Sequence, residues 1–112
     1  MSDQISILDS SSFQTDVIDS GRPTLVDFSA TWCGPCKQLL PIIEDLASEF
    51  SDRVQIAKID LDENQEIAVR YGVQAVPSLL FFRGGEVVDR LVGVHPRAAI
   101  AERLEALGPI AV

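Results

Sequence analysis

The chain alternates between stretches whose apolar residues recur at every second position and stretches where they recur at every third or fourth position. The first spacing, or a short unbroken apolar run, predicts strands over residues 4–8, 24–30, 54–59, 78–83 and 86–92. The second spacing predicts helices over residues 12–19, 34–50 and 96–107, and a short helix that carries Ile67, Ala68 and Tyr71. This order of elements predicts an α/β fold with a central mixed five-stranded β-sheet flanked by four α-helices.

Capping and turn residues mark the ends of several of these elements. Residues 9–12 and 60–63 are polar clusters suited to capping the helices that follow them. The pair Gly84-Gly85 supplies the positive backbone angles of a tight turn, which predicts an antiparallel hairpin between the last two strands. Pro41 lies inside the long helix, where we expect a kink rather than a break because the apolar pattern continues beyond it.

Composition and charge narrow the class of protein. A chain of 112 residues that is 46% hydrophobic is long enough for one domain, over residues 1–112, with one core. The formal charge of -8 argues against nucleic acid or an anionic membrane as a partner. No basic residue precedes Arg22, so we expect neither a secretory signal nor a basic transit peptide. The apolar runs are too short to span a bilayer. We therefore expect a cytoplasmic monomer without a membrane partner.

The only two cysteines of the chain lie in the stretch Trp32-Cys33-Gly34-Pro35-Cys36, between a predicted strand and a predicted helix. A structural disulfide would close a loop of roughly 4 residues and stabilise the fold by only about 1.9 kcal/mol. A zinc site needs four ligands, and beyond the two thiols and carboxylates the chain offers only His95, which is more easily explained as a surface residue, so we expect no metal. A reversible dithiol is the third interpretation, and a close pair in a cytoplasmic protein favours it.

The position of the pair assigns different roles to its two thiols. Cys33 opens a helix, where unpaired backbone N–H groups favour negative charge, so it is the candidate nucleophile. Cys36 lies on the same face within the first turn, where burial keeps the thiol protonated, so it is the candidate resolving thiol. Gly34 is expected to let the turn close tightly, and Pro35 to stiffen the loop between the sulfurs.

Asp27 is an anomaly, because it interrupts the apolar core of a strand that we expect to be covered on both faces. Burial of a carboxylate raises its pKa toward the range that is useful for proton transfer. The alternative is a solvated carboxylate at an edge of the sheet.

The chain resembles the thioredoxin family along nearly its whole length. The matching segments are Val26-Asp27-Phe28, Trp32 to Lys37, Pro41, Lys58 to Asp60, Val76-Pro77-Ser78, Gly84-Gly85-Glu86 and Gly93. The resemblance implies the thioredoxin fold and a protein-disulfide reductase with a redox-active Cys33–Cys36 disulfide. The chain departs from many bacterial members with Ser29 in place of a tryptophan and Thr31 in place of an acidic residue, and Val76 replaces the commoner Ile or Thr before the proline.

The resemblance also implies roles for three residues outside the motif. Asp27 would take the proton from Cys36, and Lys58 would pair with Asp27. Pro77 would be a cis-proline that faces the cysteine pair and exposes the backbone of Val76 to an extended substrate. The alternatives are an ordinary surface lysine at position 58 and a proline that merely opens the last hairpin.

We expect a docking surface for target proteins around the Cys33 sulfur. Its members are apolar or small, and they are Trp32, Gly34, Pro35, Val76, Pro77, Gly93 and Val94. The alternative for Trp32, the only tryptophan, is that it packs in the core.

These expectations together describe a general protein-disulfide reductase that donates electrons to target proteins and supports cell redox homeostasis. The family implies that thioredoxin reductase, drawing on NADPH, restores the dithiol, so that no cofactor need bind to this chain. A disulfide oxidase or isomerase of the same fold, and a binding module without turnover, are the rival hypotheses.

Overall fold

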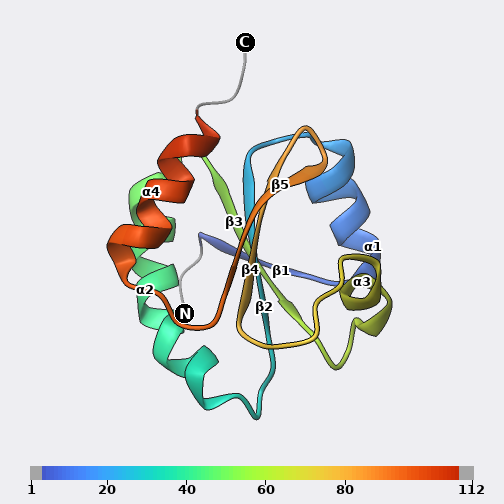
Figure 1. Cartoon of the computed structure of the whole chain (residues 1–112). Coiled ribbons are helices and arrows are strands. Elements are labelled where there is room, and N and C mark those ends of the chain that lie inside the picture. The colour runs from blue at the N-terminus through green and yellow to red at the C-terminus, as the bar shows by residue number, and fades with distance from the viewer. Residues whose placement is uncertain (1–3, 109–112) are drawn as a thin grey trace.

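A five-stranded mixed sheet forms the centre of the computed structural model, which describes residues 4–108 (Figure 1). Its strands lie in the order β1-β3-β2-β4-β5, with β1, β3 and β2 parallel and β4 and β5 antiparallel. They span Ile5–Leu8 (β1), Thr24–Ser29 (β2), Gln55–Asp60 (β3), Ser78–Arg83 (β4) and Glu86–Val92 (β5). The predicted mixed sheet and its antiparallel hairpin are therefore confirmed.

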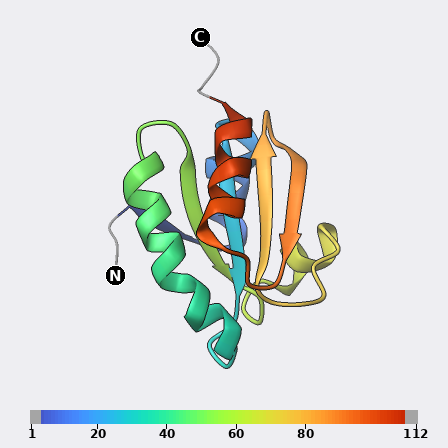
Figure 2. The same cartoon turned by 60° about the vertical axis from the view of Figure 1, so that its left-hand side comes forward.

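Helices cover both faces of this sheet. α2 (Gly34–Phe50) and α4 (Arg97–Leu107) lie on one face, and α1 (Ser10–Phe13) and α3 (Gln65–Arg70) lie on the other, as Figures 1 and 2 show. α1 continues without a gap into a π-helical segment, η1 (Gln14–Asp19). The four predicted α-helices are present, and the chain forms three layers.

The core consists of two apolar clusters separated by the sheet. The cluster beneath α2 and α4 includes Leu25, Leu39, Ile43, Phe81 and Ile100. The cluster beneath α1, η1 and α3 includes Phe13, Val26, Phe28, Ile67 and Phe82. β2 contributes to both clusters, and all six of its residues are buried, which makes it the central strand that the unbroken apolar run indicates.

The first helix begins two residues earlier than predicted, and its second part is π-helical. The side chain of Asp9 accepts hydrogen bonds from the backbone N–H groups of Ser11 and Ser12, while the Ser12 hydroxyl bonds back to the Asp9 N–H. This capping box starts the helix at Ser10, so Ser11 and Ser12 belong to the helix rather than to its cap.

The prediction that residues 60–63 cap the third helix is wrong. α3 begins at Gln65 with Asn64 as its N-cap. Asp60 instead stabilises the preceding turn, because one of its carboxylate oxygens accepts hydrogen bonds from the N–H groups of Asp62 and Glu63. The acidic cluster thus orders the β3–α3 loop, which lies beside the cysteine pair's end of the sheet.

α2 runs through Pro41 without a break, as expected, and the kink there stays a prediction. Its first residue is Gly34, so that the helix starts directly between the two cysteines. The chain leaves the carboxyl end of β2 and enters α2 within five residues. This short connection fixes the cysteine pair at the edge of the sheet where the parallel strands end.

Candidate active site

Cys33 and Cys36 form a disulfide at the N-terminus of α2, with their Cα atoms 5.3 Å apart. Cys33 is the N-cap residue of the helix, and its Sγ accepts a hydrogen bond of 3.1 Å from the backbone N–H of Cys36. In the dithiol state the same N–H and the helix dipole favour a negative charge on the Cys33 sulfur.

Burial does not distinguish the two cysteines. Cys36 is buried as expected, with 6% of its surface exposed, but Cys33 is exposed by only 3%. The two residues form a small apolar cluster with Ala30, against which Val76 packs. Their difference therefore lies in hydrogen bonding, since the Cys33 sulfur holds the N-cap position.

Asp27 is buried in β2 with 1% of its surface exposed, so the alternative of a solvated edge carboxylate is wrong. Its Oδ1 has no hydrogen-bond partner among the residues that the structure describes. Desolvation raises the pKa of this carboxyl to about 6, and the positive charge of Lys58 acts in the opposite direction. A carboxyl with this pKa exchanges a proton near neutral pH.

Lys58 lies opposite Asp27 on the neighbouring strand β3, in direct register with it. The lysine is half-buried, and within residues 4–108 no salt bridge of 4 Å or less joins it to Asp27. Lys58 therefore acts on the carboxyl through its charge and without direct contact. It is neither the close ion-pair partner that the resemblance suggests nor a fully exposed lysine.

The peptide bond between Val76 and Pro77 is cis, as the resemblance implies. Pro77 is buried, and its carbonyl oxygen accepts a hydrogen bond of 2.8 Å from the N–H of Gly93. This bond joins the loop before β4 to the loop after β5. Val76 and Gly93 are thereby held on the same side of the molecule as the disulfide.

Exposed apolar groups lie in the segments that flank the disulfide. Trp32 is 66% exposed, so the alternative that it packs in the core is wrong, and Val94 is 45% exposed. Gly34 and Pro35 are also exposed. The exposed valine Val92, which the sequence-based list omitted, precedes Gly93 at the end of β5.

Asp62 holds Trp32 in place through a contact that was not predicted from the sequence. The indole Nε1 donates a hydrogen bond of 2.6 Å to the Asp62 carboxylate. The two residues are thirty positions apart, and the turn stabilised by Asp60 brings them together. The acidic residues within 60–63 are the sequence signal for this segment, and they predict a helix cap rather than a contact with Trp32.

The expected reason for Gly34 is wrong. Its φ is not positive, and a Cβ added there would meet no atom within 4 Å. The turn therefore does not require glycine for its backbone geometry. What Gly34 leaves is open space beside the sulfurs, which is consistent with a place where another chain approaches closely.

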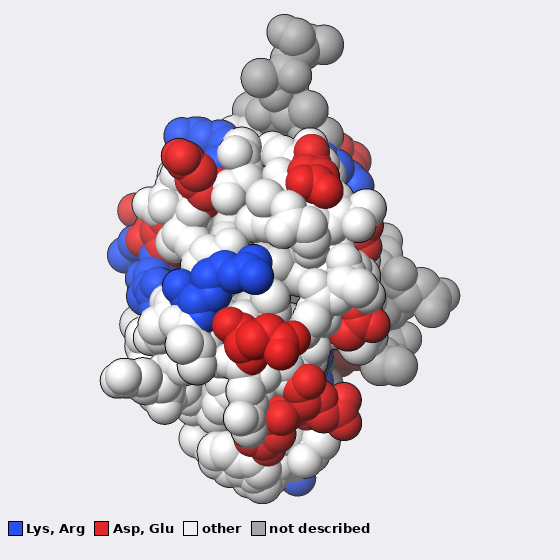
Figure 3. Space-filling model, turned by 90° about the vertical axis from the view of Figure 1, so that its right-hand side faces the viewer, with Lys and Arg blue, Asp and Glu red and all other residues white. Residues whose placement is uncertain are grey.

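The surface shows no continuous basic region on the α1 and α3 side, where acidic groups lie beside the Lys and Arg side chains (Figure 3). In the part of the chain that the structure describes, no three His, Cys, Asp or Glu side chains are grouped to hold a metal ion. Among the described helices, none has the length and apolar character needed to cross a membrane.

The fold and the cysteine pair define a thiol–disulfide oxidoreductase. The family model Thioredoxin matches residues 4–106, and the chain therefore belongs to the thioredoxin family. A thioredoxin from Chlorobaculum thiosulfatiphilum is 46% identical over 83% of this chain and 86% of its own length. One from Acidithiobacillus ferridurans is 42% identical over 95% of this chain and 98% of its own.

Two further relatives extend the comparison. A bifunctional thioredoxin reductase/thioredoxin from Mycobacterium leprae is 44% identical over 88% of this chain, which covers 21% of that longer protein. The solved structure of a mutant thioredoxin from Halobacterium salinarum NRC-1 superposes with a TM-score of 0.85 at 35% identity, over 100% of this chain and 98% of the other. The thioredoxin fold is thus confirmed, and the chain is a thioredoxin-type dithiol–disulfide redox protein.

Proposed function

We propose that this protein is a general protein-disulfide reductase of the cytoplasm, one that supplies electrons to target proteins and maintains cell redox homeostasis. The observation that carries the proposal is the hydrogen bond from the Cys36 N–H to the Cys33 sulfur at the start of α2. This hydrogen bond stabilises a thiolate on Cys33 but not on Cys36, and the thiolate is the nucleophile of disulfide exchange.

In the first step the Cys33 thiolate attacks one sulfur of a target disulfide. A bond forms between Cys33 and the target, and the second target sulfur leaves as a thiolate, which takes up a proton. The helix N-terminus favours the attacking thiolate over the thiol.

In the second step Asp27 accepts the proton of the Cys36 thiol, and the Cys36 thiolate attacks the Cys33 sulfur. The target leaves with both sulfurs reduced, and Cys33–Cys36 becomes the disulfide. Two electrons have then passed to the target. The buried carboxyl suits this role because its pKa of about 6 allows it to take a proton at neutral pH.

Target proteins dock on the surface formed by Trp32, Gly34, Pro35 and the loops that hold Val76 and Gly93. An extended segment of the target pairs with the backbone of Val76, which gives affinity with little dependence on the target's side chains. Trp32 and Val94 supply exposed apolar area at the rim of this surface.

Thioredoxin reductase, drawing on NADPH, returns the disulfide to the dithiol, and this chain binds no cofactor of its own. The support is the Mycobacterium leprae relative, whose name joins a thioredoxin reductase and a thioredoxin in one protein. A single domain of residues 1–112 is sufficient for this activity.

The test is NADPH oxidation by a thioredoxin reductase with insulin as the disulfide substrate. The native chain should couple NADPH oxidation to insulin reduction, whereas Cys33→Ser should give only the rate of the mixture without it. A rate for the native chain no higher than that of the Cys33→Ser variant would contradict the reductase assignment. A measured redox potential in the oxidising range of disulfide-forming relatives would also contradict it.

A further inference from the structure

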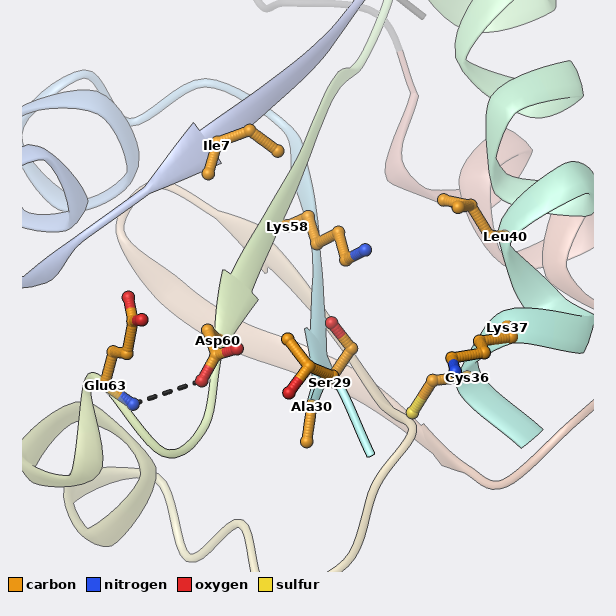
Figure 4. Close-up of a pocket in the computed structure, with 10 residues that line it drawn as sticks. Ile7, Ser29, Ala30, Cys36, Lys37, Leu40, Lys58, Asp60 and Glu63 are labelled. Atoms are coloured by element: carbon orange, nitrogen blue, oxygen red, sulfur yellow. Dashed lines mark hydrogen bonds between the residues drawn. The ribbon is translucent and has the colours of Figure 1, made fainter. Parts of the chain in front are cut away.

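A hollow lies next to the disulfide, between the first turns of α2 and the ends of β1, β2 and β3 (Figure 4). We name it the rear cleft, and its walls include Ile7, Cys36, Leu40, Lys58 and Asp60. Its volume is about 500 Å³. Pockets that bind small molecules typically have volumes of about 300–1,000 Å³, so the rear cleft has the size of a binding site.

Small side chains keep the rear cleft open on the β2 side. Ser29 and Ala30 line it at the end of β2, where any longer side chain at position 29 would fill it. Ser29 is buried and lies on the same face of β2 as Asp27, the face covered by α2, because side chains alternate along a strand. None of the residues of the docking surface described above lines the rear cleft.

Charges of opposite sign lie in different parts of the rear cleft. Lys37 from α2 and Lys58 from β3 supply two cations, whereas Asp60 and Glu63 supply two carboxylates near the β3–α3 loop. Figure 4 shows the Lys58 amine extending toward α2, away from Asp60 and Glu63. Among the described residues neither lysine makes a salt bridge with either carboxylate. The cleft therefore presents separated positive and negative groups.

Apolar side chains complete the lining. Ile7, which is 61% exposed, stands on the strand β1 at one wall, and Leu40 faces it from α2. An exposed isoleucine at a cleft wall offers apolar area to an occupant. One Asp60 oxygen is already bound to backbone N–H groups, which leaves the other as an acceptor.

We propose that the rear cleft binds a free apolar α-amino acid. Its carboxylate lies on Lys58 and Lys37, its ammonium group on Asp60 and Glu63, and its side chain between Ile7 and Leu40. A zwitterion satisfies both sets of charges, whereas a simple anion or cation would face one set of like charge. The cleft shares Cys36 and Lys58 with the proposed redox site, but the binding proposal does not rest on the reductase activity. A ligand of this size is expected to bind with a Kd of about 1 mM.

The experiment is an NMR titration of the isotope-labelled full chain with three probes. L-phenylalanine carries both charges, 3-phenylpropanoate lacks the ammonium group, and 2-phenylethylamine lacks the carboxylate. We expect saturable shifts of the Leu40, Lys58 and Glu63 amide signals with L-phenylalanine, and affinities at least about tenfold lower for the other two probes. Equal binding of 3-phenylpropanoate and L-phenylalanine, or no saturable shift with any probe, would overturn the proposal.

Two variants locate the site. Ser29→Trp should fill the rear cleft and abolish the saturable shifts, while Thr15→Trp, at an exposed position of η1 on the opposite face, should leave them unchanged. Lys58→Met should weaken the binding of L-phenylalanine by about tenfold without affecting the binding of 2-phenylethylamine. This comparison holds even if Ser29→Trp does not fold. Unchanged L-phenylalanine binding in Lys58→Met would overturn the assigned orientation and with it the proposal.

Discussion

At the scale of single residues, the site depends on one buried carboxyl, that of Asp27, and on one sulfur that caps a helix, that of Cys33. Asp27 stands in the central strand without a hydrogen bond to its Oδ1, and the folded protein stabilises its neutral form. The Cys33 sulfur accepts a hydrogen bond from the N–H of Cys36, which favours the thiolate form of Cys33. The two groups are therefore prepared for opposite parts of the exchange reaction.

The raised pKa of Asp27 has a consequence for stability. The folded chain holds this proton more tightly than the unfolded chain, so its contribution to stability is present below about pH 4 and is lost as the pH rises through about 6. We expect the variant Asp27→Asn to lack this pH-dependent decrease in stability, because an amide does not titrate. From pH 4 to pH 8, the free energy of unfolding of the native chain should fall by about 2–3 kcal/mol relative to that of the variant. Denaturant unfolding at both pH values measures this, and parallel pH profiles would contradict it.

The contact between Trp32 and Asp62 is expected to orient the indole rather than to stabilise the fold. Trp32 is 66% exposed, so Asp62→Ala should lower the free energy of unfolding by no more than about 1 kcal/mol. Because Trp32 is the only tryptophan, the tryptophan emission comes from this indole alone. The emission should change in Asp62→Ala and be largely retained in Asp62→Asn, which keeps an acceptor. Identical emission from all three proteins would mean that the contact is not formed in solution.

At the scale of elements, the hydrophobic pattern predicted the existence and type of every strand and α-helix. Periodicity reports which face is buried, so it located β2 and α2 well. It could not reveal the π-helical η1, because Val17 is buried there much as it would be in an α-helix. The role of residues 60–63 after β3 was also predicted wrongly, because acidic residues stabilise turns and helix caps through the same kind of hydrogen bond.

The β4–β5 turn gives a test at this scale. Gly84 and Gly85 both have positive φ, but only at Gly85 would a Cβ meet a backbone atom, the Ile18 carbonyl oxygen of η1, at 2.9 Å. Gly84→Ala should therefore reduce the free energy of unfolding by about 1 kcal/mol and Gly85→Ala by about 3 kcal/mol. Thermal unfolding of the two variants compares them directly. Equal losses would show that the hairpin does not press against η1.

At the scale of the whole molecule, the sequence predicted which residues are neighbours, but it predicted their specific contacts less well. The resemblance implies that Asp27, Lys58 and Pro77 act together with the cysteine pair. The structure places Lys58 opposite Asp27, and it packs Val76, which forms a cis peptide bond with Pro77, against the cysteines. Lys58 nevertheless makes no direct salt bridge with Asp27, and Asp62 and the rear cleft were missed. Such contacts depend on side-chain reach across loops, which spacing along the chain does not record.

The protein is expected to be a monomer in solution. The large apolar side chains exposed among residues 4–108 are few, and they are Ile7, Trp32, Val69, Val88, Val92 and Val94. They are divided among β1, α3, β5 and two loops, and the charge of -8 adds repulsion between copies. Sedimentation at micromolar concentration should give a mass near 12.2 kDa. A concentration-independent mass of twice that value would contradict this expectation.

The central claim is that Cys33 attacks and Cys36 resolves, and trapping of the mixed disulfide tests it most directly. The variants Cys33→Ser and Cys36→Ser are each reduced, mixed with a disulfide-containing protein, and analysed by non-reducing mass spectrometry. We expect Cys36→Ser to accumulate a covalent complex through Cys33, and Cys33→Ser to accumulate almost none. Equal trapping by the two variants, or trapping by Cys33→Ser alone, would contradict the assigned roles.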